Sequence, residues 1–207
     1  EWLFEKGVDV IADVASSPLA LLVQEINRPR GAVVFYNGVM NSDITGSKCA
    51  ATGIHWMYDG YAFNSVIGGE LTRGGSKRWY FVTVDNAFGA NVEKSPAAVI
   101  PLGSQDLFAE LRQASESGAQ VIALVNAGQD MIRAVRESFD LLRVSKGETL
   151  LAAVATALND VHQMKPQLAQ GLRLSHSFYW NMDDESRAWS RRFFERTGAM
   201  PSDLQAG

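Results

Sequence analysis

The densest group of chemically reactive side chains lies in one polar, loop-like stretch, residues 41–62. It contains the single cysteine of the chain, Cys49, and one of three histidines, His55. A thiol with a nearby imidazole can act as a nucleophile and its general base, which would indicate a hydrolase or lyase. No third group that would orient the imidazole is evident. The alternative is therefore a partly buried thiol in a structural loop.

Other residues that could do chemistry give no support for a metal or cofactor site. His55, His162 and His176 are scattered rather than placed at ligand spacing, which favours hydrogen-bonded loop histidines. The sequence has no nucleophile elbow, no phosphate-binding loop and no His-Glu-x-x-His motif. The glycine pairs at 68–69 and 74–75 do not link a strand to a helix, unlike a dinucleotide fingerprint. We therefore expect no metal, no cofactor and no enzymatic activity.

Composition and charge limit the remaining classes of function. The chain has 207 residues, of which 46% are hydrophobic and 20% charged, enough for one large domain or two lobes. The net charge is -4 and no basic patch stands out, so nucleic acid is not expected as a partner. One cysteine excludes an internal disulfide, and the apolar runs are too short to span a bilayer.

The elements that must position these side chains alternate between strand and helix. We predict strands at residues 8–14, 32–37, 78–84, 97–100, 121–125, 150–155 and 172–180. The first helix is predicted to have Ser17 as its N-cap and Pro18 in the first helical position. A later helix is predicted to be capped by Ser104 or Asp106. Further helices are predicted to begin at residue 58, near residue 131, within 159–168 and at 183–184. The strands are continuously apolar, which predicts an α/β fold with parallel sheets covered by helices.

In folds of this class, ligands bind at the carboxyl ends of the strands. The predicted ends carry polar and aromatic residues, which suit a small ligand with an anionic end and a flat apolar body. These candidates are Ser16, Ser17, Gly38, Met40, Asp85, Asn86, Phe88, Asn126, Ala127, Gly128, Asp160 and Tyr179. Structural alternatives stay open for some of them: Ser17 can cap a helix, Asp85 can cap a turn, and Tyr179 can pack in the core.

Several short segments occur in an order and spacing typical of one protein family. They are residues 7–11, 16–17, 85–89, 126–130, 159–162 and 178–180, together with the loop that runs from 43–46 past Cys49 to 55–59. Together they resemble the substrate-binding proteins of ABC importers of the branched-chain amino acid type, which are type I periplasmic binding proteins. The branch associated with aromatic acids is the most similar. The resemblance covers nearly the whole chain and depends on no single motif.

The resemblance implies two α/β lobes joined by three crossovers, with the ligand held in the cleft between them and hinge closure around it. Residues 1–76 would form part of the first lobe, 77–177 the second lobe, and 178–207 would return to the first. Carried over by position, residues 16–17 and 38–40 would meet the ligand carboxylate. Residues 86, 88 and 126–128 would face it from the second lobe, with Tyr58 and Asp160 as further candidates.

The implied function is that of an extracytoplasmic, periplasmic and monomeric solute-binding component, which presents a small carboxylate to ABC permease subunits at the membrane. Aromatic residues near strand ends favour an aromatic acid over a branched-chain amino acid. No acidic partner for an α-amino group is obvious, although Asp85 or Asp130 could serve. A ligand-sensing domain of the same fold, in a receptor or regulator, is the alternative.

The sequence departs from the family in three places. The family has a strand–helix–strand unit before the position of Glu1 and continues beyond Gly207, so we expect an incomplete lobe pair with an open sheet edge in the first lobe. The region beside Ser95 and Pro96 is about a dozen residues shorter than expected. Asn86 stands where the family often has tyrosine, which removes one aromatic wall.

Overall fold

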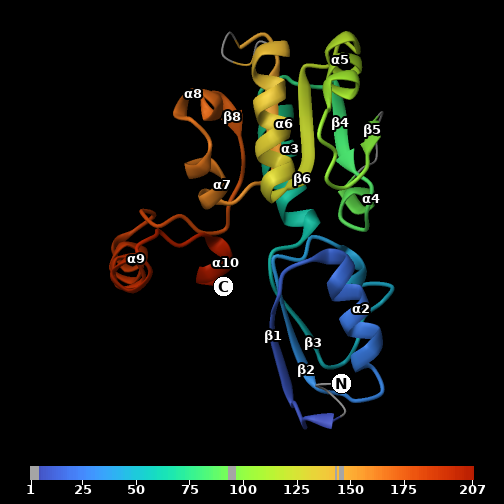
Figure 1. Ribbon diagram of the computed structural model, residues 1–207, viewed down its shortest axis with the longest axis vertical. Helices are drawn as coiled ribbons and strands as arrows, with labels where there is room; N and C mark the ends of the chain where they lie inside the picture. The colour runs from blue at the N-terminus through green and yellow to red at the C-terminus, as the bar shows by residue number, and fades with distance from the viewer. Residues whose placement is uncertain (1–4, 93–96, 143, 145–146) are drawn as a thin grey trace. The chain divides into compact units, whose positions relative to one another are not determined.

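The computed structural model describes residues 5–92, 97–142, 144 and 147–207 (Figure 1). Contacts divide the chain into unit 1, which comprises residues up to Ala62 together with Gly207, and unit 2, Phe63–Ala206. Each unit is built around its own parallel sheet. The expected lobe boundaries at 76/77 and 177/178 stay a prediction.

Unit 1 contains a three-stranded parallel sheet in the order β1-β2-β3. Its elements are β1 (Val10–Val14), α2 (Ser17–Asn27), β2 (Val33–Asn37), the 3-10 helix η1 (Ser42–Ile44) and β3 (Gly53–Met57). Parallel neighbours need a crossover connection, and α2 supplies it between β1 and β2. The small core beneath α2 consists of Val14, Ala20, Val34, Tyr36, Val39 and Ile44.

Polar bonds fix the inner face of α2. The buried Asn27 donates from Nδ2 to the Ala32 carbonyl at 2.7 Å and accepts the Ala32 N–H at 3.1 Å. The buried Gln24 donates to the carbonyl of Lys48. In the core beneath α2, burial raises the pKa of the Tyr36 hydroxyl to about 12, and the charge of Arg28 lowers this pKa by a smaller amount. The helix is thus attached to the loops at 28–32 and 48 largely through amide side chains.

The predicted strand at 8–14 begins later than expected, and Val14 is its only buried residue. Among the described residues β1 pairs only with β2, and Val10 is 53% exposed. The expected open sheet edge in this part of the chain is therefore present at β1.

Unit 2 contains a five-stranded parallel sheet in the order β5-β4-β6-β7-β8. The strands are β4 (Trp79–Val84), β5 (Ala97–Ile100), β6 (Val121–Ala127), β7 (Leu150–Ala155) and β8 (Leu172–Arg173). The helices are α3 (Gly60–Arg73), which begins at the end of unit 1, α4 (Gly89–Val92), α5 (Phe108–Glu116), α6 (Gly128–Leu141), α7 (Leu158–Gln163), α8 (Pro166–Ala169), α9 (Asp184–Thr197) and α10 (Asp203–Ala206).

The core of unit 2 lies between its sheet and the helices α5 and α6, which lie side by side over it in Figure 1. Leu111 and Ala114 of α5 and Met131 and Val135 of α6 are buried there against the strands. Every residue of β6 from Val121 to Asn126 is buried. This is the cover on both faces that the uninterrupted apolar runs predicted.

Several predicted boundaries are wrong. The N-cap of α2 is Ser16, and Ser17 is already its first helical residue. The stretch 41–62 is not one loop, because β3 runs through it. The strand predicted at 172–180 ends at Arg173. The helix α5 begins after Leu107, and of its two predicted caps only Asp106 bonds to it, with Oδ1 accepting the N–H of Phe108 at 2.9 Å.

The helix α9 confirms its predicted ends. Asp183 accepts the N–H of Ser186 at 2.7 Å, and Gly198 closes the helix with a φ of 72°. Residues 95 and 96 lie outside the described residues, so the shortened region there is bounded only by α4 and β5. Within the described chain, every helix is too short or too polar to cross a lipid bilayer.

Candidate ligand-binding residues

In unit 1, the first candidates lie where β1 passes into α2. Ser16 is exposed and takes the N-cap position through its backbone, while its side chain makes no capping hydrogen bond. Ser17 is buried one residue further on. The first-turn N–H groups and the dipole of an 11-residue helix favour an anion at this point. The Ser16 hydroxyl is therefore placed to contact an anionic group.

Gly38, Met40 and Tyr58 lie together at the carboxyl end of the same sheet. Gly38 has a φ of 75°, a conformation that favours glycine, and its N–H donates to the Met57 carbonyl at 2.6 Å. The Met40 carbonyl accepts the N–H of Gly60 at 3.1 Å. Met40 is buried, whereas Tyr58 is half-buried. Of these three, Tyr58 presents the most accessible side chain.

In unit 2, the turn after β4 is organised by Asn86. Its Oδ1 accepts the N–H groups of Phe88 at 2.8 Å and Gly89 at 3.2 Å, while the Phe88 ring is buried. A Cβ on Gly89 would overlap the Val84 carbonyl, so the turn packs directly on the end of β4. Asn86 rather than Asp85 thus stabilises this turn, and Asp85 is left exposed.

Residues 126–128 join β6 to α6. Asn126 is 0% exposed, and among the described residues neither its Nδ2 nor its Oδ1 has a hydrogen-bond partner. Ala127 is exposed as the N-cap of α6, and Gly128 has a φ of 55°. The pairing of β6 with β7 shifts register between Leu124 and Ala127, as at a β-bulge. The irregular backbone at Asn126 is typical of strand ends near functional sites.

Two further polar residues lie at this edge: Thr83, which was not considered from the sequence, and Thr156, which begins the predicted strand end at 156–160 but was not chosen as a contact. Thr83 of β4 and Thr156 directly after β7 are buried, and each has an Oγ1 without a hydrogen-bond partner in the described part of the chain. Their strands flank β6 in the sheet. Thr156 directly follows an apolar strand, which is a signal in the sequence, whereas Thr83 lies inside β4 and has no such signal.

The last two candidates, Asp160 and Tyr179, come after β7 in the chain. Asp160 of α7 accepts the Ala157 N–H at 3.0 Å. Burial raises the pKa of the Asp160 carboxyl. The bond from Ala157 and the charge of His176 lower this pKa by smaller amounts. His176 Nδ1 lies 2.9 Å from Asp203 Oδ2. Tyr179 is exposed, with its ring centroid 5.5 Å from that of Trp180. The region combines a half-buried carboxyl with accessible aromatic rings.

The structure does not support the reactive pair in residues 41–62. Cys49 is exposed, so the expectation of a partly buried thiol is wrong. His55 lies on β3, and its Nε2 is 2.6 Å from the Val39 carbonyl. Among the described residues, no three His, Cys, Asp or Glu side chains cluster as a metal site would require.

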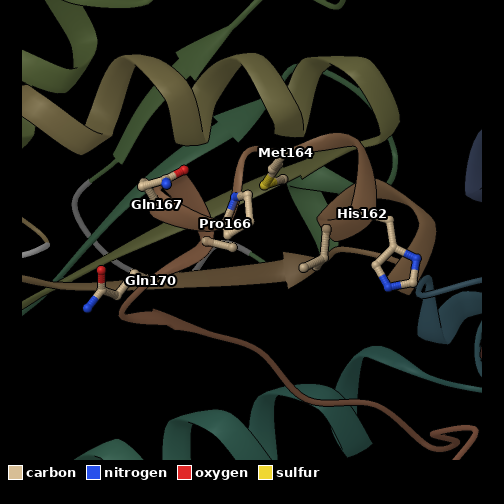
Figure 2. A pocket seen from close by; sticks show the side chains of 7 residues that line it. His162, Met164, Pro166, Gln167 and Gln170 are labelled. Atoms are coloured by element: carbon tan, nitrogen blue, oxygen red, sulfur yellow. The ribbon is translucent and has the colours of Figure 1, made fainter.

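An open hollow at α7 and α8 has a volume of about 660 Å³. Figure 2 shows the side chains that line it. It is lined by Val161, His162, Met164, Pro166, Gln167, Ala169 and Gln170. None of these is a predicted ligand contact. A second hollow, of about 480 Å³, involves residues 77–81 at the amino end of β4. Both hollows are therefore distinct from the strand-end residues.

Comparison with known proteins places this arrangement in a family. The family described as periplasmic binding protein matches the sequence over residues 1–207. The chain belongs to the periplasmic binding protein family. A comparison with curated protein sequences found no match.

Three solved structures show the same fold. A periplasmic binding protein from Burkholderia mallei is 32% identical, with a TM-score of 0.92 over 100% of this chain and 58% of its own. A branched-chain amino acid ABC transporter periplasmic ligand-binding protein from Burkholderia xenovorans is 29% identical, with a TM-score of 0.82 and the same coverage. An ABC transporter solute-binding protein from R. palustris, in complex with benzoate, is 13% identical, with a TM-score of 0.80 over 98% of this chain and 59% of its own.

These similarities confirm the predicted type I periplasmic binding protein fold and the resemblance to substrate-binding proteins of ABC importers. The chain spans 58% of the length of the first two structures. Proteins of this family bind substrates and are not enzymes, so the prediction of no enzymatic activity is confirmed and the Cys49 hydrolase hypothesis is wrong. The family name indicates an extracytoplasmic location.

Proposed function

We propose that this protein is the extracytoplasmic solute-binding component of an ABC importer, and that it captures a small aromatic carboxylate. One observation carries the proposal: in a chain of this family, the predicted contact residues other than Tyr179 lie at, or within five residues after, the carboxyl ends of parallel strands. This is where ligands bind in open α/β sheets. The protein would act as a monomer in the periplasm and deliver its ligand to permease subunits.

The carboxylate is assigned to the edge of unit 1. Ser16 offers an exposed hydroxyl at the start of α2, and that hydroxyl is not used for capping. Hydrogen bonds to an ionised group are stronger than those between neutral groups, so a carboxylate gains more here than a neutral ligand would. The backbone turn at Gly38 lies at the carboxyl end of the neighbouring strand.

An aromatic acid fits the described residues better than an amino acid does. Asp130, one of two possible partners for an α-amino group, accepts the Gly103 N–H at 2.8 Å and lies 3.1 Å from Arg133 Nη1. Only Asp85 is left exposed for that purpose. Tyr58 and Tyr179 offer flat apolar surfaces for a ring. The benzoate complex of the R. palustris protein supports the compatibility of this fold with such a ligand.

The test is calorimetric titration of the full-length protein with benzoate, cinnamate and leucine. We expect the aromatic acids to bind and Ser16→Ala to weaken benzoate binding about tenfold, which corresponds to about 1.4 kcal/mol for one charge-assisted hydrogen bond. Ser47→Ala, at an exposed loop serine, is the matched control. Binding of leucine alone would reject the aromatic ligand, and an unchanged Ser16→Ala affinity would reject the carboxylate contact.

A further inference from the structure

The hollow of about 480 Å³ at the amino end of β4 has the features of a binding site. It is lined by Lys77, Arg78, Trp79, Tyr80 and Phe81 at the start of β4, and by Ser117 and Ala119 in the turn between α5 and β6. All of these residues belong to unit 2. Pockets that hold small molecules have volumes of about 300–1,000 Å³, so its size suits a small molecule. We call it the β4 hollow.

The β4 hollow lies at the opposite end of the sheet from the predicted contacts. Lys77 and Arg78 come directly before Trp79, the first residue of β4. Because the strands of this sheet are parallel, their amino ends share one edge and their carboxyl ends the other. The six residues of β4 separate the two edges by about 20 Å. A molecule in the β4 hollow therefore leaves the strand-end residues free.

Two aromatic rings give the hollow a flat apolar wall. Trp79 and Phe81 are half-buried and stacked, with ring centroids 6.2 Å apart and an angle of 21° between their planes. Within the described chain β5 pairs with β4 only from Phe81 onwards. The helix that connects these strands, α4, has four residues, whereas such crossovers usually carry a longer helix. The two rings thus keep part of their surface open to a ligand.

Two cationic side chains stand at the same hollow. Lys77 and Arg78 are exposed, and within the described chain neither makes an ion pair. Both backbone N–H groups donate to Gln120 Oε1, at 2.9 and 3.2 Å, and Arg78 Nε donates to the Gly118 carbonyl at 2.9 Å. These bonds fix the segment and leave the terminal guanidinium nitrogens of Arg78 available for an anion.

A buried hydroxyl adds a further polar group to this lining. Tyr80 is 5% exposed, and its hydroxyl has no hydrogen-bond partner among the described residues. Burial raises the pKa of this hydroxyl and the charge of Glu110 raises it further, so the hydroxyl stays protonated and can donate. Glu116, the other carboxyl of α5, is bonded to Arg112 at 2.8 Å. Two cations against one nearby carboxyl favour an anionic ligand.

We propose that the β4 hollow binds an organic anion with a flat apolar body, at a second site separate from the strand ends. The anionic group bonds to Lys77 and Arg78, and the apolar body lies against the rings of Trp79 and Phe81. A guanidinium suits this role because its planar fork forms paired hydrogen bonds to the oxygens of an anion. The inference goes beyond the proposed function and does not depend on it.

The experiment is fluorescence titration of the full-length protein with anilinonaphthalene sulfonate, compared with phenylnaphthylamine, which has the same rings but no sulfonate. We expect saturable binding of the anion and at least about tenfold weaker binding of the uncharged analogue, because bonds to an ionised group are stronger. Lys77→Gln combined with Arg78→Gln should weaken anion binding about tenfold and leave the analogue within about twofold. Arg191→Gln combined with Arg192→Gln, two exposed arginines of α9, is the matched control.

Three results would overturn the inference. One is equal affinity of the protein for the anion and for its uncharged analogue. Another is an anion affinity that the Lys77 and Arg78 variant shares with the wild type, since the probe would then bind elsewhere. The third is displacement of the probe by benzoate, which would mean a single shared site. If the variant does not fold, the uncharged analogue and benzoate displacement decide the matter on the wild type.

The proposed function is tested separately by benzoate titration. A protein that binds benzoate but not the sulfonate probe keeps the proposed function and loses this inference. A protein that binds the probe through Lys77 and Arg78 but binds none of the aromatic acids keeps this inference and loses the proposed function.

Discussion

The two sheets follow the same parallel pattern but differ in how they are covered. In unit 2, β6 is buried from Val121 to Asn126, with strands on both sides and helices over it. In unit 1, β1 buries only Val14 and leaves its other residues half-buried or exposed. A continuous apolar run thus predicts a strand in both places, but its burial depends on neighbours that the run itself does not specify.

The helices show the same contrast. In α6, apolar residues such as Met131 and Val135 are buried against the sheet. In α2, the buried side includes Gln24 and Asn27, while the exposed large apolar residues are Leu19, Leu22 and Ile26. Unit 2 is therefore held mainly by apolar burial, whereas unit 1 depends strongly on specific amide hydrogen bonds.

The largest expected effect is from a core truncation in unit 2. Leu124 is fully buried in the middle of β6, so Leu124→Ala should lower the free energy of unfolding of unit 2 by about 2–5 kcal/mol. The matched change in unit 1, Leu22→Ala, removes a side chain that is more than half exposed and should cost less than about 0.5 kcal/mol. Denaturant unfolding followed by hydrogen exchange, resolved by peptide, measures both.

Equal losses for the two leucines would contradict the contrast, because Leu22 would then be covered in solution. Loss of protection across both units on Leu124→Ala would show that they unfold together. Only the first result would mean that the exposed apolar residues of α2 contribute to burial.

This contrast also explains which parts of the fold were predictable. The core strands β4, β6 and β7 are uninterrupted apolar runs, and α9 has a capping aspartate and a closing glycine, so both were found from sequence. The edge strand β3, Gly53–Met57, includes histidine and glycine and has alternating burial. The sequence did not predict β3, because the stretch around it is polar and its pairing with β2 depends on tertiary contacts.

For the candidate site, the strand-end rule predicted Asn126, Gly128 and Asp160, and the structure has all three at or shortly after the carboxyl ends of β6 and β7. It could not distinguish Asn86, whose amide is used within its own turn, from Asn126, whose amide has no partner in the described chain. That difference depends on local backbone geometry. Thr83 lies inside its strand, so a rule about residues after strands passes over it.

A smaller effect tests the polar attachment of α2. Asn27→Ala removes both hydrogen bonds to the buried residue Ala32, so we expect a loss of about 1–3 kcal/mol confined to unit 1. Glu25→Ala, which removes only an exposed pair with Arg28, should change stability by less than about 0.5 kcal/mol. Peptide-resolved hydrogen exchange of β2 and α2 is the measurement, and an Asn27→Ala effect no larger than that of Glu25→Ala would refute it.

The smallest effect depends on pH and belongs to unit 2. Burial raises the pKa of Asp160 above its ordinary value in the folded chain, so folding favours the protonated carboxyl. Its stabilising contribution is complete below the ordinary pKa and is lost as the pH rises through the raised pKa. Asp160→Asn keeps an oxygen that can accept the Ala157 N–H but has no proton to lose. The variant should therefore gain stability relative to the wild type as the pH rises across this acidic window.

Urea unfolding at a series of pH values measures the difference, with protection of α7 as the local reading. Parallel curves for the two proteins would mean that the Asp160 carboxyl is as well solvated in the folded chain as in the unfolded one.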